Sequence, residues 1–261
     1  MPTAIEALLD WPADSLVGLA EGLLVTLQLL LGSVLLGAAL AVPLALAVTH
    51  GSRRQAALAR GYIATFRGTP LLVQLYTLYY GLSQFEWLRQ SPAWWLLEDA
   101  FCCGLLALGL NLAAYVAEDL RAGIQAVPPG QVEAGRALGL SRWQCLRWVV
   151  LPAAWRIATP ALGNELIAQV KATALVSAIT VLDLTGVARR QANAAYTLDA
   201  LLAAGAVYAL MALLCALAVR VVATRYSPHG GRGAAAVATP AAATAQPPAE
   251  RASPPWRVFL R

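Results

Sequence analysis

Two apolar stretches of this 261-residue sequence each carry a pair of polar side chains four residues apart. Glu165 and Gln169 form one pair, and Asn111 and Tyr115 form the other. Residues four apart lie on the same face of an α-helix, so each pair predicts a polar stripe on an otherwise apolar helix. An ionisable group in such surroundings usually faces a cavity, a pore or a partner. The chemistry expected of Glu165 is the binding of a cationic group.

Hydrogen bonding between helices is the simpler interpretation of both pairs, and such contacts contribute about 1 kcal/mol each in a membrane. Thr69 also has two interpretations. It precedes Pro70, so it fits the N-cap of a helix that starts at the proline. It also fits the polar wall of a cavity. The residues alone leave both interpretations open for Thr69 and for the two pairs.

The sequence has none of the patterns that would indicate catalysis. A phosphate-binding GxxxxGK[ST] motif does not occur, and the cysteines and histidines lack the spacing of a metal site. We therefore expect no catalytic residue and no metal in this chain. The net charge of +5 does not indicate nucleic-acid binding, because the arginines lie in segments between apolar blocks.

The elements that must position these residues are predicted from composition. Hydrophobic residues make up 59% of the chain and charged residues only 13%, against roughly 45–50% and about 25% in soluble domains. The excess lies in blocks long enough to cross a membrane, which takes about 20 apolar residues. We therefore predict an all-α integral membrane protein with about five transmembrane helices, over Leu16–Val48, Tyr62–Leu82, Ala100–Ala117, Val149–Val170 and Tyr196–Val222.

The distribution of arginine predicts the orientation, because cytoplasmic loops collect Lys and Arg. If the N-terminus is outside and five helices cross, the inside segments 49–61, 119–148 and 219–261 hold 13 of the 18 arginines. A sixth crossing at 172–188 would move the arginine-bearing C-terminal segment outside. We therefore interpret 172–188 as a re-entrant or surface segment on the outer side.

These assignments divide the chain into three parts. An external segment over 1–15 precedes a transmembrane domain over 16–226, and the tail over 227–261 is rich in Ala, Pro, Gly and Thr. That composition predicts a disordered tail, which the orientation places in the cytoplasm. Asp183 falls on the predicted outer side and is expected to be an exposed charge.

A polar, arginine-bearing loop over 133–152 lies between two predicted spans on the inside. Its first part predicts a short helix over 132–138, with Glu133 near the N-terminus, where the helix dipole favours a carboxylate. Gly139 permits a left-handed turn. The segment Ser141–Gln144 then has the form of a capping box that starts a second helix. Such a rigid surface knob suits docking to a soluble partner, and a polar loop without a partner is the alternative.

The loop resembles the EAA loop in permease subunits of binding-protein-dependent ABC importers. The family pattern is EAA, three residues, Gly, nine residues, an aliphatic residue, any residue and Leu-Pro, matched here by Glu133, Ala134, Gly135, Gly139, Val149, Leu151 and Pro152. Gly135 replaces the second alanine, and Val149 replaces the usual isoleucine. In that family the loop is a coupling helix seated in a groove of a cytoplasmic ATPase. The resemblance therefore assigns coupling to Glu133, Ala134, Gly135, Gly139, Leu140 and Trp143.

Further segments resemble permeases for polar amino acids such as histidine, arginine, lysine, ornithine and opines. They are 66–75, 111–118, 162–165 and 171–177. The resemblance implies a type I ABC importer permease in a bacterial inner (plasma) membrane, moving polar, and by the chemistry of Glu165 basic, amino acids. The substrate path would then include Glu165, Gln169, Asn111, Tyr115 and Thr69.

The same resemblance implies partners, because an importer needs parts that this chain lacks. These are a second permease subunit, which is a copy or a paralogue, cytoplasmic ATPase subunits that carry ATP and Mg, and an external solute-binding protein. Two other classes remain as alternatives. An ion-coupled secondary transporter would typically show paired repeats, which the sequence lacks, and a non-transport membrane assembly protein would not need Glu165 or Asn111 within spans.

Overall fold

The computed structural model of the protein describes residues 13–92 and 94–226, and this part of the chain contains helices and no strands. The predicted all-α class is therefore confirmed. The predicted tail over 227–261 and most of the predicted external segment over 1–15 lie outside the described residues.

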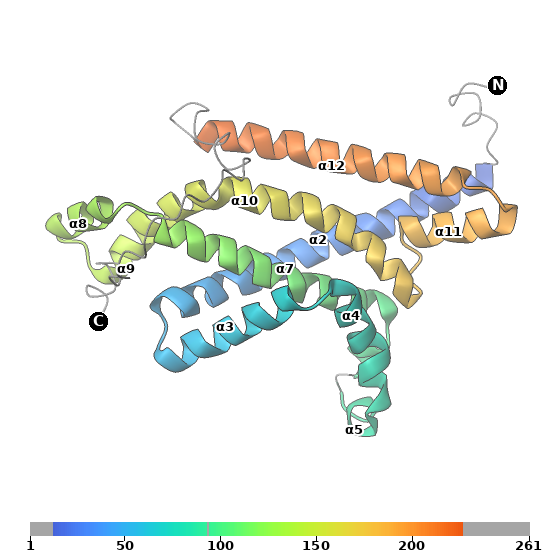
Figure 1. Ribbon diagram of the computed structural model, residues 1–261, viewed down its shortest axis with the longest axis horizontal. Helices are drawn as coiled ribbons and strands as arrows, with labels where there is room; N and C mark the ends of the chain where they lie inside the picture. Colours follow the sequence, from blue (N-terminus) through green and yellow to red (C-terminus); the bar gives the residue numbers. More distant parts are fainter. Residues whose placement is uncertain (1–12, 93, 227–261) are drawn as a thin grey trace, which may run out of the picture.

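Four long helices run along the molecule and form its body (Figure 1). They are α2 (Ala13–His50), α7 (Ala100–Gln125), α10 (Leu151–Ala172) and α12 (Asp199–Tyr226). Among the described residues, α2, α7 and α12 are long and apolar enough to cross a membrane. The segment 142–179, which contains α10, gives a fourth candidate together with α11 (Leu184–Ala195), from which it is bent by 53°. These helices correspond to four of the five predicted spans.

The second predicted span, over 62–82, is wrong as a continuous helix. α3 (Arg53–Gly68) ends before Pro70 and α4 (Leu71–Tyr76) begins after it. Thr69 is extended between them, with φ −115° and ψ 142°. Pro70 has no N–H to continue the hydrogen bonds of α3, and its ring disfavours a helical conformation for the residue before it. The chain therefore breaks inside the predicted span.

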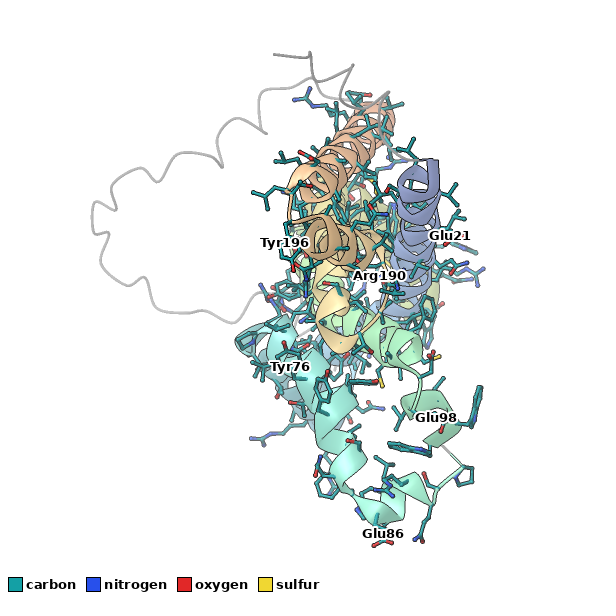
Figure 2. The ribbon with its side chains drawn as sticks, turned by 90° about the vertical axis from the view of Figure 1, so that its right-hand side faces the viewer. Glu21, Tyr76, Glu86, Glu98, Arg190 and Tyr196 are labelled. Carbon is teal, nitrogen blue, oxygen red and sulfur yellow. The ribbon has the colours of Figure 1, made fainter. Side chains whose placement is uncertain are left out.

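After α4 the chain leaves the long helices and returns. A π-helical turn over 77–81 and a 3₁₀ turn over 82–84 lead into α5 (Glu86–Arg89) and α6 (Trp94–Leu97). Figure 2 shows this arm extending away from the body, with Glu86 near its end. Asp99 then caps the start of α7 by accepting a hydrogen bond from the Cys102 amide.

The predicted knob between spans is present as two short helices, α8 (Pro129–Ala137) and α9 (Arg142–Cys145). A π-helical turn over 146–150 joins α9 to α10 without a break. These short helices lie at one end of the molecule, as do the connection between α2 and α3 and the C-terminal end of α12 (Figure 1). α7 leads directly into this end, and α10 leads away from it.

The segment 172–188 begins as a 3₁₀ helix over Thr173–Ile179 and then turns sharply, with Thr180 at φ 73°. Asp183 caps the next helix, α11. The expectation that Asp183 is an exposed charge is wrong, because its side chain is fully buried and hydrogen-bonded. The helix is broken and bent at this point. Both a broken span and a re-entrant segment have such a bend, so the re-entrant interpretation stays a prediction.

Small residues bring the long helices close together, as is typical of membrane helices. A Cβ added to Gly109 of α7 would lie 2.6 Å from Cδ2 of Leu36 on α2, and one added to Gly163 of α10 would overlap Val219 of α12. Beside these contacts lies an apolar cluster that includes Leu29, Leu75, Leu108, Val176 and Ile179. This packing fixes the positions of α7 and α10 on either side of a polar cavity.

Candidate functional site

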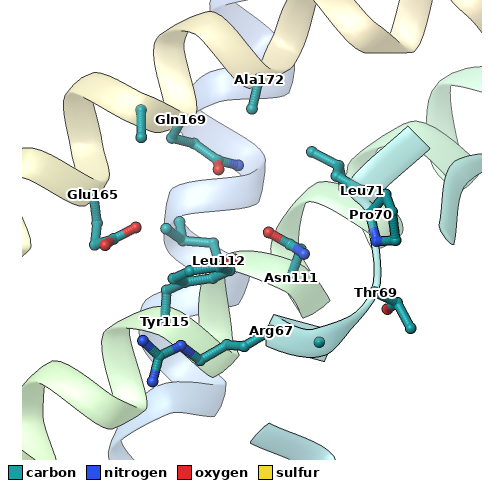
Figure 3. Close-up of a pocket in the computed structure, with 12 residues that line it drawn as sticks. Arg67, Thr69, Pro70, Leu71, Asn111, Leu112, Tyr115, Glu165, Gln169 and Ala172 are labelled. Carbon is teal, nitrogen blue, oxygen red and sulfur yellow. The ribbon is translucent and has the colours of Figure 1, made fainter. Parts of the chain in front are cut away.

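A cavity of about 580 Å³ lies between the break after α3, the middle of α7 and the C-terminal half of α10. All five residues predicted for a substrate path line it (Figure 3). The prediction that each polar pair lies on one face of its helix is confirmed, since both members of each pair border the cavity. The complete lining is Arg67, Gly68, Thr69, Pro70, Leu71, Asn111, Leu112, Tyr115, Glu165, Ala168, Gln169 and Ala172.

The wall at the break is held together by one amide side chain, that of Gln74. In an unbroken helix the Phe66 carbonyl would accept a hydrogen bond from the amide four residues on, but residue 70 is proline. Gln74 Nε2 donates to the Phe66 oxygen instead, at 2.9 Å. It also lies 3.1 Å from the Thr69 carbonyl oxygen and 2.8 Å from Thr69 Oγ1. Gln74 therefore replaces the helical bonding that the proline prevents.

Asn111 connects α7 to this break. Its Nδ2 donates to Gln74 Oε1 at 3.1 Å and to the Phe66 carbonyl at 3.3 Å. Hydrogen bonding between helices and a place on a cavity wall were alternatives for this residue. In the structure Asn111 does both, because its amide nitrogen bonds the neighbouring element while the residue borders the cavity.

Thr69 borders the cavity but does not cap the following helix, so its predicted capping role is wrong. Pro70 occupies the N-cap position of α4, and Thr69 is the C-cap of α3. The Thr69 hydroxyl donates back to the Thr65 carbonyl at 2.8 Å. Because Thr69 is extended and not helical, its side chain points toward Gln74 of α4 and accepts a bond there.

The α10 wall carries Glu165 and Gln169. The Gln169 side chain is buried, and its Nε2 donates to Ser33 Oγ of α2 at 2.8 Å and to the Leu108 carbonyl of α7 at 3.4 Å. Glu165 is half-buried, and within the described residues its carboxylate has no hydrogen bond or ion pair. Glu165 therefore presents an uncommitted carboxylate to the cavity.

Arg67 is a cavity residue that sequence reasoning missed. Its guanidinium lies over the Tyr115 ring, 5.1 Å from the ring centroid, and its Nη1 is 3.8 Å from Glu118 Oε1. Glu118 is also bound by Arg121, which lies one turn further along α7. Arg67 is the next-to-last residue of α3, and it borders the cavity because the helix ends at Gly68, beside the break. Recognising the break at Pro70 would have identified it.

The coupling residues predicted from the loop form a separate group on α8, on α9 and in the connection between them. Gly139 has φ 81°, which confirms the left-handed turn, and Ser141 and Gln144 make both hydrogen bonds of a capping box. Glu133 is exposed, but its predicted place near a helix N-terminus is wrong. α8 begins at Pro129, four residues earlier, so Glu133 lies in the second turn, beyond the strongest effect of the dipole.

The six coupling residues divide between the surface and the interior of the loop. Ala134 and Glu133 are exposed, and Trp143 is 76% exposed. Leu140 is half-buried, whereas Gly135 is buried and packs against α9, so that an added Cβ would lie 3.2 Å from Cys145 Sγ.

Leu138, which was not predicted as a coupling residue, is 83% exposed in the same loop. The turn after α8 and the helix α9 thus present two large apolar side chains, Leu138 and Trp143, to the solvent.

Known proteins resemble this chain in sequence and in fold. It is 45% identical to the octopine transport system permease protein OccM of Rhizobium radiobacter over 196 residues, which are 75% of this chain and 80% of that protein. It is 41% identical to the arginine ABC transporter permease protein ArtM of Haemophilus influenzae over 162 residues, 61% of this chain and 70% of that protein.

A solved structure described as an amino acid ABC transporter with histidines superposes with a TM-score of 0.72, at 36% identity, over 81% of this chain and 95% of the other. This match confirms the type I importer fold. The sequence profile of the binding-protein-dependent transport system inner membrane component matches residues 29–229. The importer family is thereby favoured over a secondary transporter or an assembly protein, and the chain belongs to the binding-protein-dependent transport system inner membrane components.

Proposed function

We propose that this permease subunit imports amino acids that carry a cationic side chain, and that the cavity between α3, α7 and α10 is its solute site. The observation that carries the proposal is the uncommitted carboxylate of Glu165 in the cavity wall. Only Glu165 and Arg67 are charged among the twelve lining residues. A carboxylate attracts a cationic side chain, and a guanidinium attracts an α-carboxylate. The solutes of the two relatives, an octopine permease and an arginine permease by name, support this solute class.

The partners follow from the family and from the exposed loop. Cytoplasmic ATPase subunits, which would bind ATP and Mg, dock on α8 and α9, and a second permease subunit and an external binding protein complete the importer. ATP-driven movement of the loop opens the cavity outward, and hydrolysis resets it. The solute shifts this equilibrium only through its different affinities for the two states.

A physical link between loop and cavity supports this coupling. α7 carries Asn111 in the cavity wall and continues without a break to Gln125. Just beyond its end, Val127 packs with Leu146 and Val150 of the segment that joins α9 to α10. About 14 residues of helix separate Asn111 from the loop, a span of roughly 21 Å, so one rigid element connects the two sites.

The orientation is proposed with the N-terminal end of α2 outside and the C-terminal end of α12 in the cytoplasm. Three arginine-bearing parts lie at one end of the molecule: the loop of α8 and α9, the start of α3 beside its connection to α2, and the end of α12 (Figure 1). Clustering of arginine at one membrane face is typical of the cytoplasmic side, which supports this orientation.

The test is uptake of radiolabelled arginine by cells that express the complete transporter, with unlabelled competitors. We expect lysine and ornithine to compete more strongly than glutamine, and glutamate to compete least. Strong competition by glutamate would contradict the proposed solute class. Affinity purification of the chain from native membranes, followed by mass spectrometry, tests the partners, and its recovery without an ATPase from intact protein would contradict the proposed assembly.

A further inference from the structure

The orientation of the Asn111 amide is determined by its neighbours. Its Nδ2 lies near the Phe66 carbonyl oxygen and near Gln74 Oε1. A carbonyl oxygen only accepts hydrogen bonds, so the group facing Phe66 must be the NH₂ of Asn111. Gln74 is fixed in the same way, since its Nε2 faces the carbonyl oxygens of Phe66 and Thr69. Its Oε1 is therefore turned toward Asn111, where it accepts.

The orientation of the Gln169 amide is determined by Ser33 of α2. The Ser33 hydroxyl is fully buried and donates to the Leu30 carbonyl at 3.1 Å. Its single proton is thus used, so toward Gln169 it accepts from Nε2. The Leu108 carbonyl, which only accepts, lies on the same side of the amide. Gln169 therefore has both of its N–H groups directed away from the cavity.

Both amides consequently turn their oxygen atoms toward the cavity. Figure 3 shows the oxygens of Asn111 and Gln169 on the cavity side of each amide, with the nitrogens directed to the neighbouring helices. Within the described residues, neither Asn111 Oδ1 nor Gln169 Oε1 has a hydrogen-bond partner. With the Glu165 carboxylate, these oxygens give the cavity three acceptor groups from α7 and α10.

We infer that Ser33 and Gln74 are specificity-determining positioning residues, although neither lines the cavity. By holding the NH₂ groups of Gln169 and Asn111, they make the wall an acceptor surface that fits a donor-rich cationic side chain. The surface disfavours a neutral group of the same shape that carries an acceptor. This inference rests on the proposed function, because it assumes that an amino acid occupies the cavity.

Arginine and citrulline are the sharpest pair of probes. They have nearly the same shape, but citrulline has a carbonyl oxygen where arginine has an N–H donor. A site built from hydrogen-bonding groups rejects the mismatched analogue strongly. Equilibrium binding of both ligands is measured on the purified transporter, with the permease and ATPase subunits together in detergent. The external binding protein is omitted so that its own selectivity does not enter.

Wild-type protein is expected to bind arginine more tightly than citrulline. Ser33→Ala removes the closer of the two acceptors of Gln169 Nε2 and leaves only the Leu108 carbonyl at 3.4 Å, so the amide is held less firmly and turns its NH₂ group to the cavity more often. We expect the ratio of the two dissociation constants to fall about tenfold. Ser33→Thr keeps the hydroxyl and is expected to restore most of the ratio.

Thr26→Ala is the matched control, because Thr26 is another fully buried hydroxyl of α2. It donates to the Gly22 carbonyl and accepts from the Leu184 amide, without a bond to a cavity residue. We expect this variant to lose stability but to keep the wild-type ratio. A change in the ratio as large as that of Ser33→Ala would show that the effect is general loosening of the helices.

The outcomes separate the inference from the proposed function. Wild-type protein that binds neither ligand contradicts the proposed function. Wild-type protein that prefers arginine, with an unchanged ratio in Ser33→Ala, overturns the inference alone. If Ser33→Ala does not accumulate in membranes, Gln74→Met makes the same test through Asn111. It removes the Oε1 acceptor and leaves Asn111 Nδ2 only the longer bond to the Phe66 carbonyl, at 3.3 Å, so retention of the full preference in that variant overturns the inference.

Discussion

Tyr208 donates a hydrogen bond to Asp183, with 3.1 Å between the hydroxyl oxygen and Oδ2, across 25 residues of sequence. The other carboxylate oxygen accepts from the Gly186 amide at 2.9 Å, which caps α11. Thr185 in turn donates to the Tyr208 hydroxyl at 3.1 Å. A fully buried carboxylate thus ties the break before α11 to α12.

Asp183→Ala should destabilise the protein by about 1–3 kcal/mol, because it leaves a buried hydroxyl and a helix N-terminus without their acceptor. Thermal unfolding of the purified chain measures this loss. Tyr208→Phe should cost less, and the double variant should lose less than the two single losses combined, because the residues share a bond. Asp99→Ala removes the exposed cap of α7 and should cost only about 1 kcal/mol. Additive losses for Asp183 and Tyr208 would contradict the shared bond.

Glu165→Gln should selectively weaken the uptake of cationic amino acids. The substitution keeps the shape of the side chain and removes its charge, and a hydrogen bond to a charged group contributes roughly 2 kcal/mol, about 30-fold in affinity. Arginine uptake near its half-saturating concentration should fall, while uptake of a neutral amino acid should change little. Glu21→Gln neutralises an exposed carboxylate of α2 that does not line the cavity, and is the control. Unchanged arginine uptake in Glu165→Gln would contradict the assigned role.

Trp143→Ala should reduce recovery of the ATPase in affinity purification without lowering the thermal stability of the chain. The side chain is 76% exposed, so its removal costs little packing within this subunit. Buried aromatic residues contribute strongly to interfaces, and their truncation often costs 2 kcal/mol or more, roughly 30-fold in affinity. Trp87→Ala is the control, since Trp87 is 70% exposed on α5, away from the loop. Equal ATPase recovery from both variants would place the contact elsewhere.

Gly139→Ala should weaken the turn between α8 and α9 by about 1 kcal/mol, because its φ of 81° is unfavourable for a residue with a Cβ. Open space surrounds the added atom, so the effect is one of backbone conformation alone. Gly130→Ala tests this interpretation. It also meets open space, but it lies within α8 at ordinary helical φ and should be neutral or slightly stabilising. Both stabilities are measured by thermal unfolding, and equal values would contradict the conformational argument.

Local patterns predicted the parts of the site that depend on local geometry. Spacing along one helix suffices to put Asn111 beside Tyr115 and Glu165 beside Gln169, and the cavity contains all four. The capping box at Ser141 and the left-handed turn at Gly139 were predictable for the same reason, since each depends on residues within a few positions.

Contacts between distant segments explain what sequence reasoning missed. Ser33 meets Gln169 across 136 residues, and Gln74 meets Asn111 across 37. Asp183 is a single charged residue in a mainly apolar segment, and its burial depends on the contact with Tyr208 of α12, which is 25 residues away in the sequence. At Pro70 a kinked helix and a true break are equally compatible with an apolar run. The break is stabilised by the Gln74 side-chain amide, which donates to the Phe66 carbonyl that the proline leaves without a partner.

Pro70 affects the cavity because its backbone nitrogen carries no hydrogen. The Phe66 oxygen therefore stays available, and together with Gln74 Oε1 it accepts from Asn111 Nδ2 and orients that amide. Residue 70 therefore becomes a sequence marker for solute preference, although a proline ring recognises no charge. Among related permeases, those with another residue at this position should have a continuous second helix. Where such a permease has asparagine at position 111, that amide would lose one of its two acceptors, and the selectivity for cationic solutes should be weaker.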